Sequence, residues 1–197
     1  MKRTLLLLSL GLVLLLSAGC LKEKVLEIVL TGETYADFSQ DEESSSWTTP
    51  ALIDVGREIR EILDDSDYST DDLTAAHITS ASYGVTSFSQ AHDWEISGTI
   101  TVTYGGLTET IVNYTAQSIQ GALGEKISAP LVPEGVDLIN QALQDFLDGD
   151  NPVLMFTIDN GTTVPAPSAE DRMIFNWRAW LAVQVIVEES VEVPDPF

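Results

Sequence analysis

Residues 94–104 alternate between apolar and polar side chains, and this pattern limits the fold more than any other feature of the chain. A period of two places successive residues on opposite faces of a β-strand, so one face can be buried while the other is solvated. Gly105 and Gly106 follow directly, and two glycines suit a tight hairpin because both turn positions can take positive φ. Residues 107–116 then return as the partner strand. The buried face of this antiparallel hairpin should consist of Trp94, Ile96, Ile100, Val102 and Tyr104.

Three further segments are predicted to be strands. Residues 25–38 alternate in the same way, and Gly32 is the expected site of a bulge. Residues 73–88 are rich in Thr, Ser, Ala, Val and Tyr. Residues 152–158 form a short apolar run that ends in the turn signal 159–161, which is Asp-Asn-Gly. The chain therefore contains several short strands in addition to the hairpin.

Residues 173–188 are predicted to be the last strand, because apolar residues stand at every second position and the segment ends in valines. A buried helix is the alternative. In a regular strand Trp177 faces the core, while Trp180 lies on the opposite, mixed face beside Arg178. Trp180 and Arg178 are thus candidates for a platform that stacks on a sugar or binds a partner. The alternative for Trp180 is burial beneath one of the predicted helices.

Two segments show the period of an amphipathic helix. Residues 50–63 begin with proline at a favourable first position, after Thr49 as N-cap. Residues 133–148 end at Gly149, a residue typical of helix C-termini. The apolar stripe of the first helix is Leu52, Val55, Ile59, Ile62 and Leu63, and that of the second is Val136, Ile139, Leu143, Phe146 and Leu147.

The two apolar stripes align at a constant offset of 84 residues, as Val55 with Ile139 and Ile59 with Leu143 illustrate. The offset is consistent with a duplicated βαββ unit, although any two amphipathic helices can be aligned by chance. The predicted fold class is α+β, with about six strands in an antiparallel sheet or sandwich and two amphipathic helices. The predicted segments are a leader at 1–19, a link at 20–24, a single domain at 25–190 and an acidic tail at 191–197.

The first twenty residues have the form of an export signal. Lys2 and Arg3 give a positive start, residues 5–16 are almost all leucine, and small residues precede Cys20. The apolar run is shorter than the roughly 20 residues that a membrane-spanning helix needs. The segment therefore predicts cleavage and export. One interpretation is an ordinary secretory signal in which the position of Cys20 is a coincidence.

The other interpretation is lipid attachment, because the residues Leu16-Ser17-Ala18-Gly19-Cys20 resemble the lipobox of bacterial lipoproteins, although that family prefers leucine where this chain has Ser17. The resemblance implies cleavage before Cys20, lipid attachment to its thiol, and often acylation (for example with palmitate) of its new amino group. It implies a lipid-anchored protein at the cell membrane. Leu21, rather than aspartate, follows the cysteine, and this implies sorting to the outer membrane if the host is Gram-negative.

Charge and cysteine content exclude several classes of function. Removal of residues 1–19 leaves seven basic and 31 acidic residues, a net charge of −24, so nucleic acid is not an expected partner. Cys20 is the sole cysteine, so after lipidation no thiol remains for a disulfide, a thiolate metal site or a nucleophile. Membrane attachment through the lipid on Cys20 is the one partner interaction that the sequence predicts.

Acidic residues cluster after the first predicted helix, and clustered carboxylates are the ligands that Ca²⁺ prefers. The EF-hand pattern fails, because Thr70 and Ala76 occupy the positions that require glycine and glutamate when the loop is counted from Asp65. A solvated helix end is the simpler interpretation, and the sequence indicates no metal or other cofactor. The weak calcium candidates are Asp64, Asp65, Asp67 and Asp71.

His77 and His92 are the two histidines of the chain, and His92 precedes Asp93. Neighbouring residues on a turn seldom form a working acid–base pair, and the sequence lacks nucleophile-elbow and zinc-protease motifs. We therefore expect no catalytic residues. The leading hypothesis is a non-catalytic binding or scaffolding domain; the alternatives are a carrier of an apolar ligand in a pocket between helices and sheet, and an envelope hydrolase.

Overall fold

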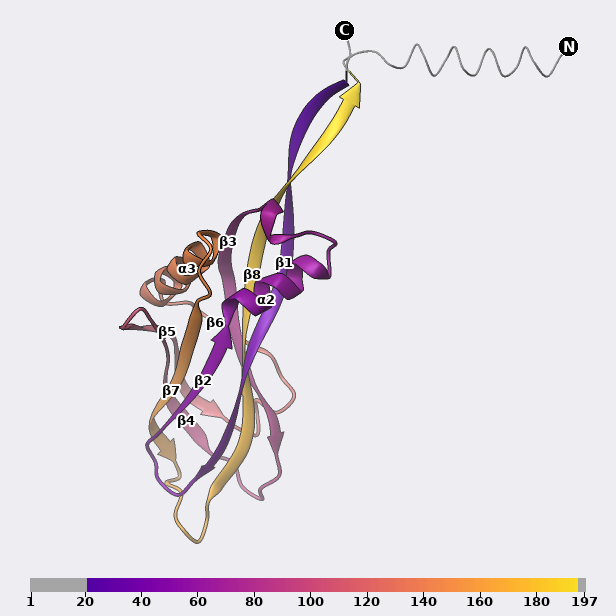
Figure 1. Ribbon diagram of the computed structural model, residues 1–197. Helices are drawn as coiled ribbons and strands as arrows, with labels where there is room; N and C mark the ends of the chain where they lie inside the picture. The colour runs from indigo at the N-terminus through magenta and orange to yellow at the C-terminus, as the bar shows by residue number, and fades with distance from the viewer. Residues whose placement is uncertain (1–20, 195–197) are drawn as a thin grey trace, which may run out of the picture.

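The computed structural model describes residues 21–194, which form a β-sandwich with two short helices at one end (Figure 1). Strands account for 61% of the structure and helices for 16%. The elements are β1 (Leu21–Glu42), β2 (Trp47–Asp54), α2 (Val55–Asp64), the 3₁₀ turn η1 (Thr70–Asp72), β3 (Leu73–Phe88), β4 (Glu95–Tyr104), β5 (Leu107–Ser118), β6 (Ile127–Ala129), α3 (Pro133–Leu147), β7 (Val153–Val164) and β8 (Met173–Pro194).

Within residues 21–194 the strands make two antiparallel sheets of four strands each. The first sheet has the order β1-β8-β3-β6 and the second the order β2-β7-β4-β5. The predicted α+β class is therefore wrong. Both sheets have an apolar inner face, and these faces bury each other. The helices α2 and α3 add buried side chains, such as Ile59 and Leu143, to the same core.

The two halves of the chain occupy equivalent places in the sandwich. Each half has the order strand, strand, helix, strand, strand, with α2 in the first and α3 in the second. Exchanging β1–β4 with β5–β8 in order converts β1-β8-β3-β6 into β5-β4-β7-β2, which is the second sheet in reverse. The predicted βαββ unit is wrong, because each half has four strands and divides them between both sheets.

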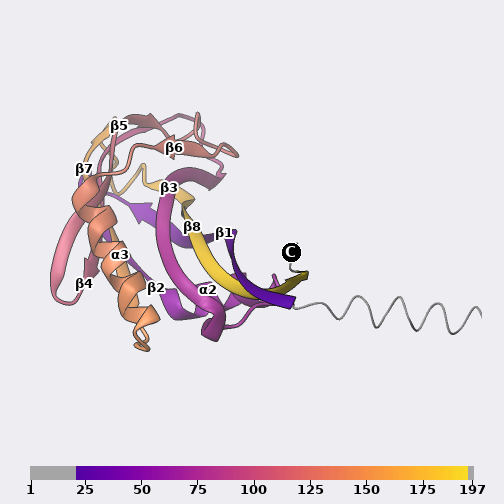
Figure 2. The same cartoon turned by 90° about the horizontal axis from the view of Figure 1, so that it is seen from above.

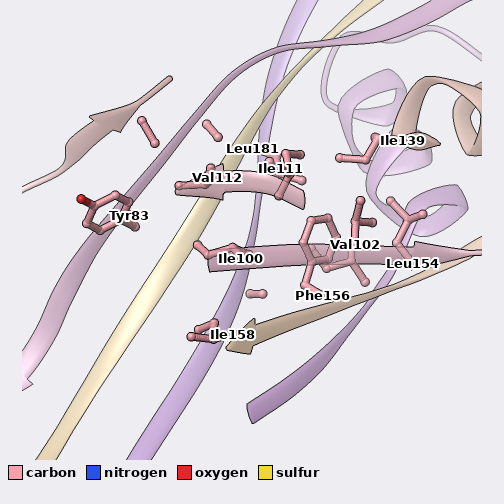
Figure 3. Close-up of a cluster of buried hydrophobic side chains, with 14 of the residues drawn as sticks. Tyr83, Ile100, Val102, Ile111, Val112, Ile139, Leu154, Phe156, Ile158 and Leu181 are labelled. Atoms are coloured by element: carbon pink, nitrogen blue, oxygen red, sulfur yellow. The ribbon is translucent and has the colours of Figure 1, made fainter. Parts of the chain in front are cut away.

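The core lies between the sheets, and Figure 3 shows side chains from both converging there. Val102, Ile158 and Leu154 of the second sheet are almost completely buried. Trp177 of β8 is 2% exposed and meets five aromatic rings at centroid distances of 5.7 to 6.4 Å. The rings around Trp177 are those of Phe38, Trp47, Tyr83, Tyr114 and Phe175.

The first predicted helix is partly wrong, because residues 47–54 form β2 and the helix starts at Val55. Asp54 is the N-cap and accepts a hydrogen bond from the backbone N–H of Arg57 at 3.0 Å. Leu52, which we expected on the buried stripe, is 71% exposed. Pro50 is tolerated because β2 is an edge strand, where one side of the backbone needs no partner.

The second predicted helix is confirmed as α3, which ends beside Gly149 at a φ of +98°. Both helices lie at the same end of the sandwich. In the view from above, α3 lies alongside the strands at the outside of the sandwich (Figure 2). Asn140 of α3 accepts a hydrogen bond from the backbone N–H of Ile78 at 3.1 Å, which ties α3 to β3. Among residues 21–194 no helix has the length and apolar character needed to cross a membrane.

Two local predictions about irregular backbone are wrong. Gly32 is not a bulge, since β1 and β8 stay in register through it; a Cβ there would overlap the side chain of Ile62, so glycine allows α2 to approach β1. The predicted turn at 159–161 is part of β7. Asn160 is buried there, and its side-chain amide donates hydrogen bonds to the Ser45 carbonyl and to the Thr163 hydroxyl, both at 2.9 Å. The amide therefore serves long-range contacts and not a local turn.

A two-stranded ribbon projects from the end of the sandwich that carries the helices (Figure 1). It consists of residues 21–27 of β1 paired with residues 188–194 of β8. The pairing of β3 with β8 stops at Leu73 and Val187, so within the described chain the ribbon has no third strand. Near its base Tyr68 donates a hydrogen bond to Glu189 at 3.2 Å. The predicted acidic tail is therefore ordered in β8 up to residue 194, and 195–197 lie outside the described residues.

Candidate functional site

Two aromatic residues lie side by side on the outer face of the first sheet. Tyr35 of β1 is opposite Trp180 of β8; Tyr35 lies between two buried residues, and Trp180 lies between partly buried Ala179 and buried Leu181. Tyr35 is 51% exposed, whereas Trp180 is partly buried. The next row pairs Asp37 with Arg178, and Lys126 reaches Trp180 from the segment before β6. We call these five residues the aromatic face: Tyr35, Asp37, Lys126, Arg178 and Trp180.

Cations stack on both rings of the aromatic face. The guanidinium carbon of Arg178 lies 3.7 Å from the centre of the Tyr35 ring and 6.0 Å from that of Trp180. The ammonium nitrogen of Lys126 lies 5.1 Å from the Trp180 ring. A cation within about 6 Å of a ring centre is attracted by the ring quadrupole. The four side chains therefore form a continuous stack that holds the exposed Tyr35 ring in a defined place.

Each cation is also paired with a carboxylate. Arg178 donates to both oxygens of Asp37 at 2.6 and 2.7 Å, a bidentate arrangement. These hydrogen bonds from Arg178 hold the pKa of Asp37 below its usual range. Lys126 pairs with Glu33 in the neighbouring row. The positive charges of this surface are therefore compensated locally.

A shallow polar groove of about 320 Å³ adjoins the aromatic face. Five of its six lining residues carry a hydroxyl, amide, carboxylate or guanidinium group, so it offers both hydrogen-bond donors and acceptors. Asn176 in the groove donates to Ser87 at 2.8 Å. We call this the polar groove; its lining residues are Asp37, Phe38, Ser39, Thr86, Asn176 and Arg178.

Gly84 allows the segment before β6 to lie against β3. A Cβ at Gly84 would overlap the carbonyl oxygen of Glu125. The backbone N–H of Gly124 donates to the carbonyl of Val85 at 2.9 Å. This close backbone contact carries Lys126 onto the aromatic face.

The outer face of the second sheet is quite different, because threonines occupy much of it. Leu52 and Met155, 71% and 37% exposed, continue the row of Thr103 and Thr108. Thr101 of β4 lies between Thr157 of β7 and Thr110 of β5, and Thr103 is paired with Thr108. The hydroxyls of the last two are 2.7 Å apart, so they satisfy each other. We call this the threonine face: Thr101, Thr103, Thr108, Thr110 and Thr157.

The prediction for 173–188 is confirmed as a strand, and Trp177 and Trp180 do lie on opposite faces of β8. The helical alternative for this segment is wrong. Trp180 is covered by Lys126 and Arg178 rather than by a helix. Sequence reasoning missed Tyr35 and Lys126 as its neighbours. Tyr35 could have been noticed, because it is an aromatic residue on the polar side of an alternating strand.

The acidic residues after α2 do not form a metal centre. No group of carboxylate, histidine or cysteine residues in the described range 21–194 is arranged to hold a metal ion. Asp64 is the last residue of α2 and Asp65 is its C-cap, while Asp67 adopts positive φ in the following turn. Asp71 lies in η1, so the four calcium candidates follow a helix end and its turn.

The two histidines lie apart from the aromatic face. His92 is 3.2 Å from Asp171, and both side chains are largely exposed. Asp93, the partner suggested by sequence, instead accepts hydrogen bonds from the backbone N–H groups of Trp94 and Gln120, both at 2.8 Å. His77 is on β3, where it pairs with a glutamine of β8. Asp93 therefore has a structural role, since backbone groups of other residues occupy its carboxylate.

The interior offers little space for a carried ligand. An apolar cavity between the two sheets has a volume of about 10 Å³, and another between the helices and the sheets has a volume of about 20 Å³. A pocket for a small organic ligand needs about 300 Å³ or more. These cavities give no support to the hypothesis of apolar-ligand carriage.

The leader and Cys20 lie outside the described residues. Leu21, the residue after Cys20, is the first residue of β1 and stands at the tip of the ribbon, paired with Pro194. Lipidation of Cys20 therefore stays a prediction from sequence.

Comparisons with known proteins do not assign a family. No protein-family model matches the chain, and no curated protein matches it. A structure from Desmodium yellow mottle tymovirus is similar with a TM-score of 0.27 and 12% identity, over 90% of this chain and 86% of the viral one. The decameric BFDV capsid protein is similar with a TM-score of 0.27 and 9% identity, over 82% of this chain and 99% of the capsid chain. Similarity at this level supports no conclusion about fold or function.

Proposed function

We propose that this chain is a lipid-anchored protein of the cell envelope that displays a non-catalytic binding domain away from the membrane. The observation that carries the proposal is the position of Leu21 at the tip of the ribbon, directly after Cys20. A lipid on Cys20 would attach the membrane to the end of the ribbon farthest from the strands of the sandwich (Figure 1).

The ribbon suits the role of a spacer. Its seven residue pairs, from Leu21–Pro194 to Glu27–Glu188, would span about 23 Å at the usual rise per strand residue. Two paired strands are stiffer than an unpaired linker of the same length. Five acidic residues of the ribbon outnumber Lys22 and Lys24, so anionic lipid head groups would repel the ribbon and help to keep it off the surface. The acidic residues are Glu23, Glu27, Glu188, Glu189 and Glu192.

The binding role is supported by the aromatic face, which presents the half-exposed Tyr35 ring beside Trp180 and Arg178. We propose no catalytic role for His77 or His92 and no resident cofactor. If the host has two membranes, the anchor is expected in the outer membrane, because Leu21 follows the cysteine.

Mass spectrometry and fractionation of the full chain expressed in a bacterium test the anchoring. The mature amino terminus should be Cys20 with lipid attached, and the protein should sediment with membranes. Cys20→Ala should abolish both, whereas the control Ser17→Leu, which restores the preferred lipobox residue, should keep both. An unacylated amino terminus, or a wild-type protein that is freely dissolved, would contradict the proposal.

A further inference from the structure

We infer that the aromatic face and the polar groove together bind a neutral saccharide. This inference rests on the proposed function only in taking the sandwich to be a binding domain, and its test does not depend on the anchor. The decisive observation is the contrast with the threonine face, which occupies the equivalent place in a sheet of equivalent topology. The second sheet carries threonines together with exposed Leu52 and Met155 in its outer rows, so a sheet of this topology does not require Tyr35, Trp180 and Arg178 on its outer side.

The residues present on the aromatic face match the chemistry of a sugar ring. A pyranose has an apolar face of C–H groups and a rim of hydroxyls, so it is recognised by a flat aromatic ring beside hydrogen-bonding groups. Tyr35 is 51% exposed, and because Arg178 stacks on one face of its ring at 3.7 Å, the sugar would rest on the opposite face.

The polar groove begins one row away from the Tyr35 ring. Two residues along a strand advance about 6.8 Å, so Asp37 and Arg178 lie within reach of hydroxyls on a sugar that rests on Tyr35. Asn176 and Ser39 form the following row and line the same groove. A saccharide of two or more units could therefore contact the ring with one unit and the groove with the next.

The charge of the surface favours a neutral saccharide over an acidic one. Arg178 is paired with Asp37, and Lys126 with Glu33, so neither cation is free of a carboxylate. The net charge of the whole chain is −22, which would repel polyanions.

The surroundings of the aromatic face favour a saccharide over a protein partner. Stable protein interfaces have an apolar core of considerable area. Here Ser82 shares the row of the two rings, the adjacent row carries the Asp37–Arg178 ion pair, and Ser39 and Asn176 follow in the row after it, so the surroundings are polar. Such groups are better matched to sugar hydroxyls than to apolar side chains of another protein.

Titration of the full-length protein in detergent tests the inference. The probes are neutral hexasaccharides built from glucose, xylose, mannose and N-acetylglucosamine, with oligogalacturonate as the acidic counterpart. Binding would be followed by calorimetry and by tryptophan fluorescence. We expect at least one neutral probe to bind, and Tyr35→Ala to weaken it by about tenfold, because a stacking ring contributes up to about 1.5 kcal/mol.

Two control variants separate recognition from folding. Tyr35→Phe keeps the ring and should retain most of the affinity. Thr101→Val alters the threonine face without removing the branched side chain, and it should bind like the wild type.

Several results would overturn the inference. They are no binding of any neutral probe at millimolar concentration, equal binding by wild type and Tyr35→Ala, preference for oligogalacturonate, and Tyr35-dependent capture of an envelope protein without saccharide binding. Failure of anchoring would be seen instead by fractionation of Cys20→Ala and wild type, so the two proposals fail separately.

Discussion

The outer faces of the two sheets differ far more than their topology does. The sheets exchange when the two halves of the chain are exchanged. One outer face presents Tyr35 and Trp180 stacked with cations, whereas the other presents paired threonines with Leu52 and Met155 beside them. Threonine suits a solvated strand by its β-propensity alone. We therefore expect that the sandwich does not need the residues of the aromatic face for its stability.

The strand β8 shows the same division within a single element. Trp177 points inward and meets five rings, whereas Trp180, three residues later, points outward and meets Lys126 and Arg178. The inner face supplies stability through burial, and the outer face is expected to contribute little to it. Substitutions on the inner, aromatic and threonine faces should therefore differ in their cost, and the inner face should be the most sensitive.

Trp177→Ala should cause the largest loss of stability, about 3–5 kcal/mol, because it leaves a cavity between the sheets. Urea unfolding followed by circular dichroism would measure the free energy of unfolding. A loss below about 1 kcal/mol would mean that the inner face is not the main source of stability.

Gly84→Ala should cost about 1–3 kcal/mol, because the added methyl overlaps the Glu125 carbonyl and displaces the segment that carries Lys126. Trp180 should then become more accessible to a fluorescence quencher such as acrylamide. Ser82→Ala, in the same strand beside Trp180, is the matched control and should leave quenching nearly unchanged. Unaltered quenching in Gly84→Ala would show that this contact does not position Lys126.

Asp37→Asn should cost about 0.5 kcal/mol near neutral pH, since Asp37 and Arg178 form an exposed ion pair that solvent screens. Hydrogen bonds from Arg178 lower the pKa of Asp37. Its contribution is therefore present above the pKa of the unfolded chain and is lost as the pH falls through the lower folded value. The difference in unfolding free energy between wild type and variant should shrink to zero in acid. A difference that grows on acidification would refute this sign.

Thr101→Val should have the smallest effect, with an unfolding free energy close to that of the wild type. The Thr101 hydroxyl makes one long hydrogen bond, 3.4 Å to the Thr157 carbonyl, and valine keeps the branched shape that suits a strand. Thermal unfolding would suffice to check it. A large destabilisation would mean that the threonine face also has a structural role.

Elements with strong local signals were predictable from sequence. The Gly105–Gly106 hairpin is confirmed, with φ of +58° and +83° at the two glycines, and α3 is confirmed from its period and its stop at Gly149. The opposite orientations of Trp177 and Trp180 followed from alternation alone.

Other features depend on contacts that are distant in sequence. Residues 50–54 carry a helical pattern, but pairing with β7 on the edge of a sheet decides that they form a strand. The predicted fold class was wrong for the same reason, because local periodicity does not determine which of the two sheets each strand joins. Lys126 comes from a short segment without periodicity, so its position over Trp180 could not be inferred.

The unfolding free energy of Trp180→Ala, measured beside that of Trp177→Ala, decides whether the outer face of β8 is separate from the structural core. We expect Trp180→Ala to lose less than half as much stability as Trp177→Ala, because Trp180 packs on exposed cations instead of buried rings. Equal losses, or a larger loss for Trp180→Ala, would contradict this separation and would make the aromatic face a structural element.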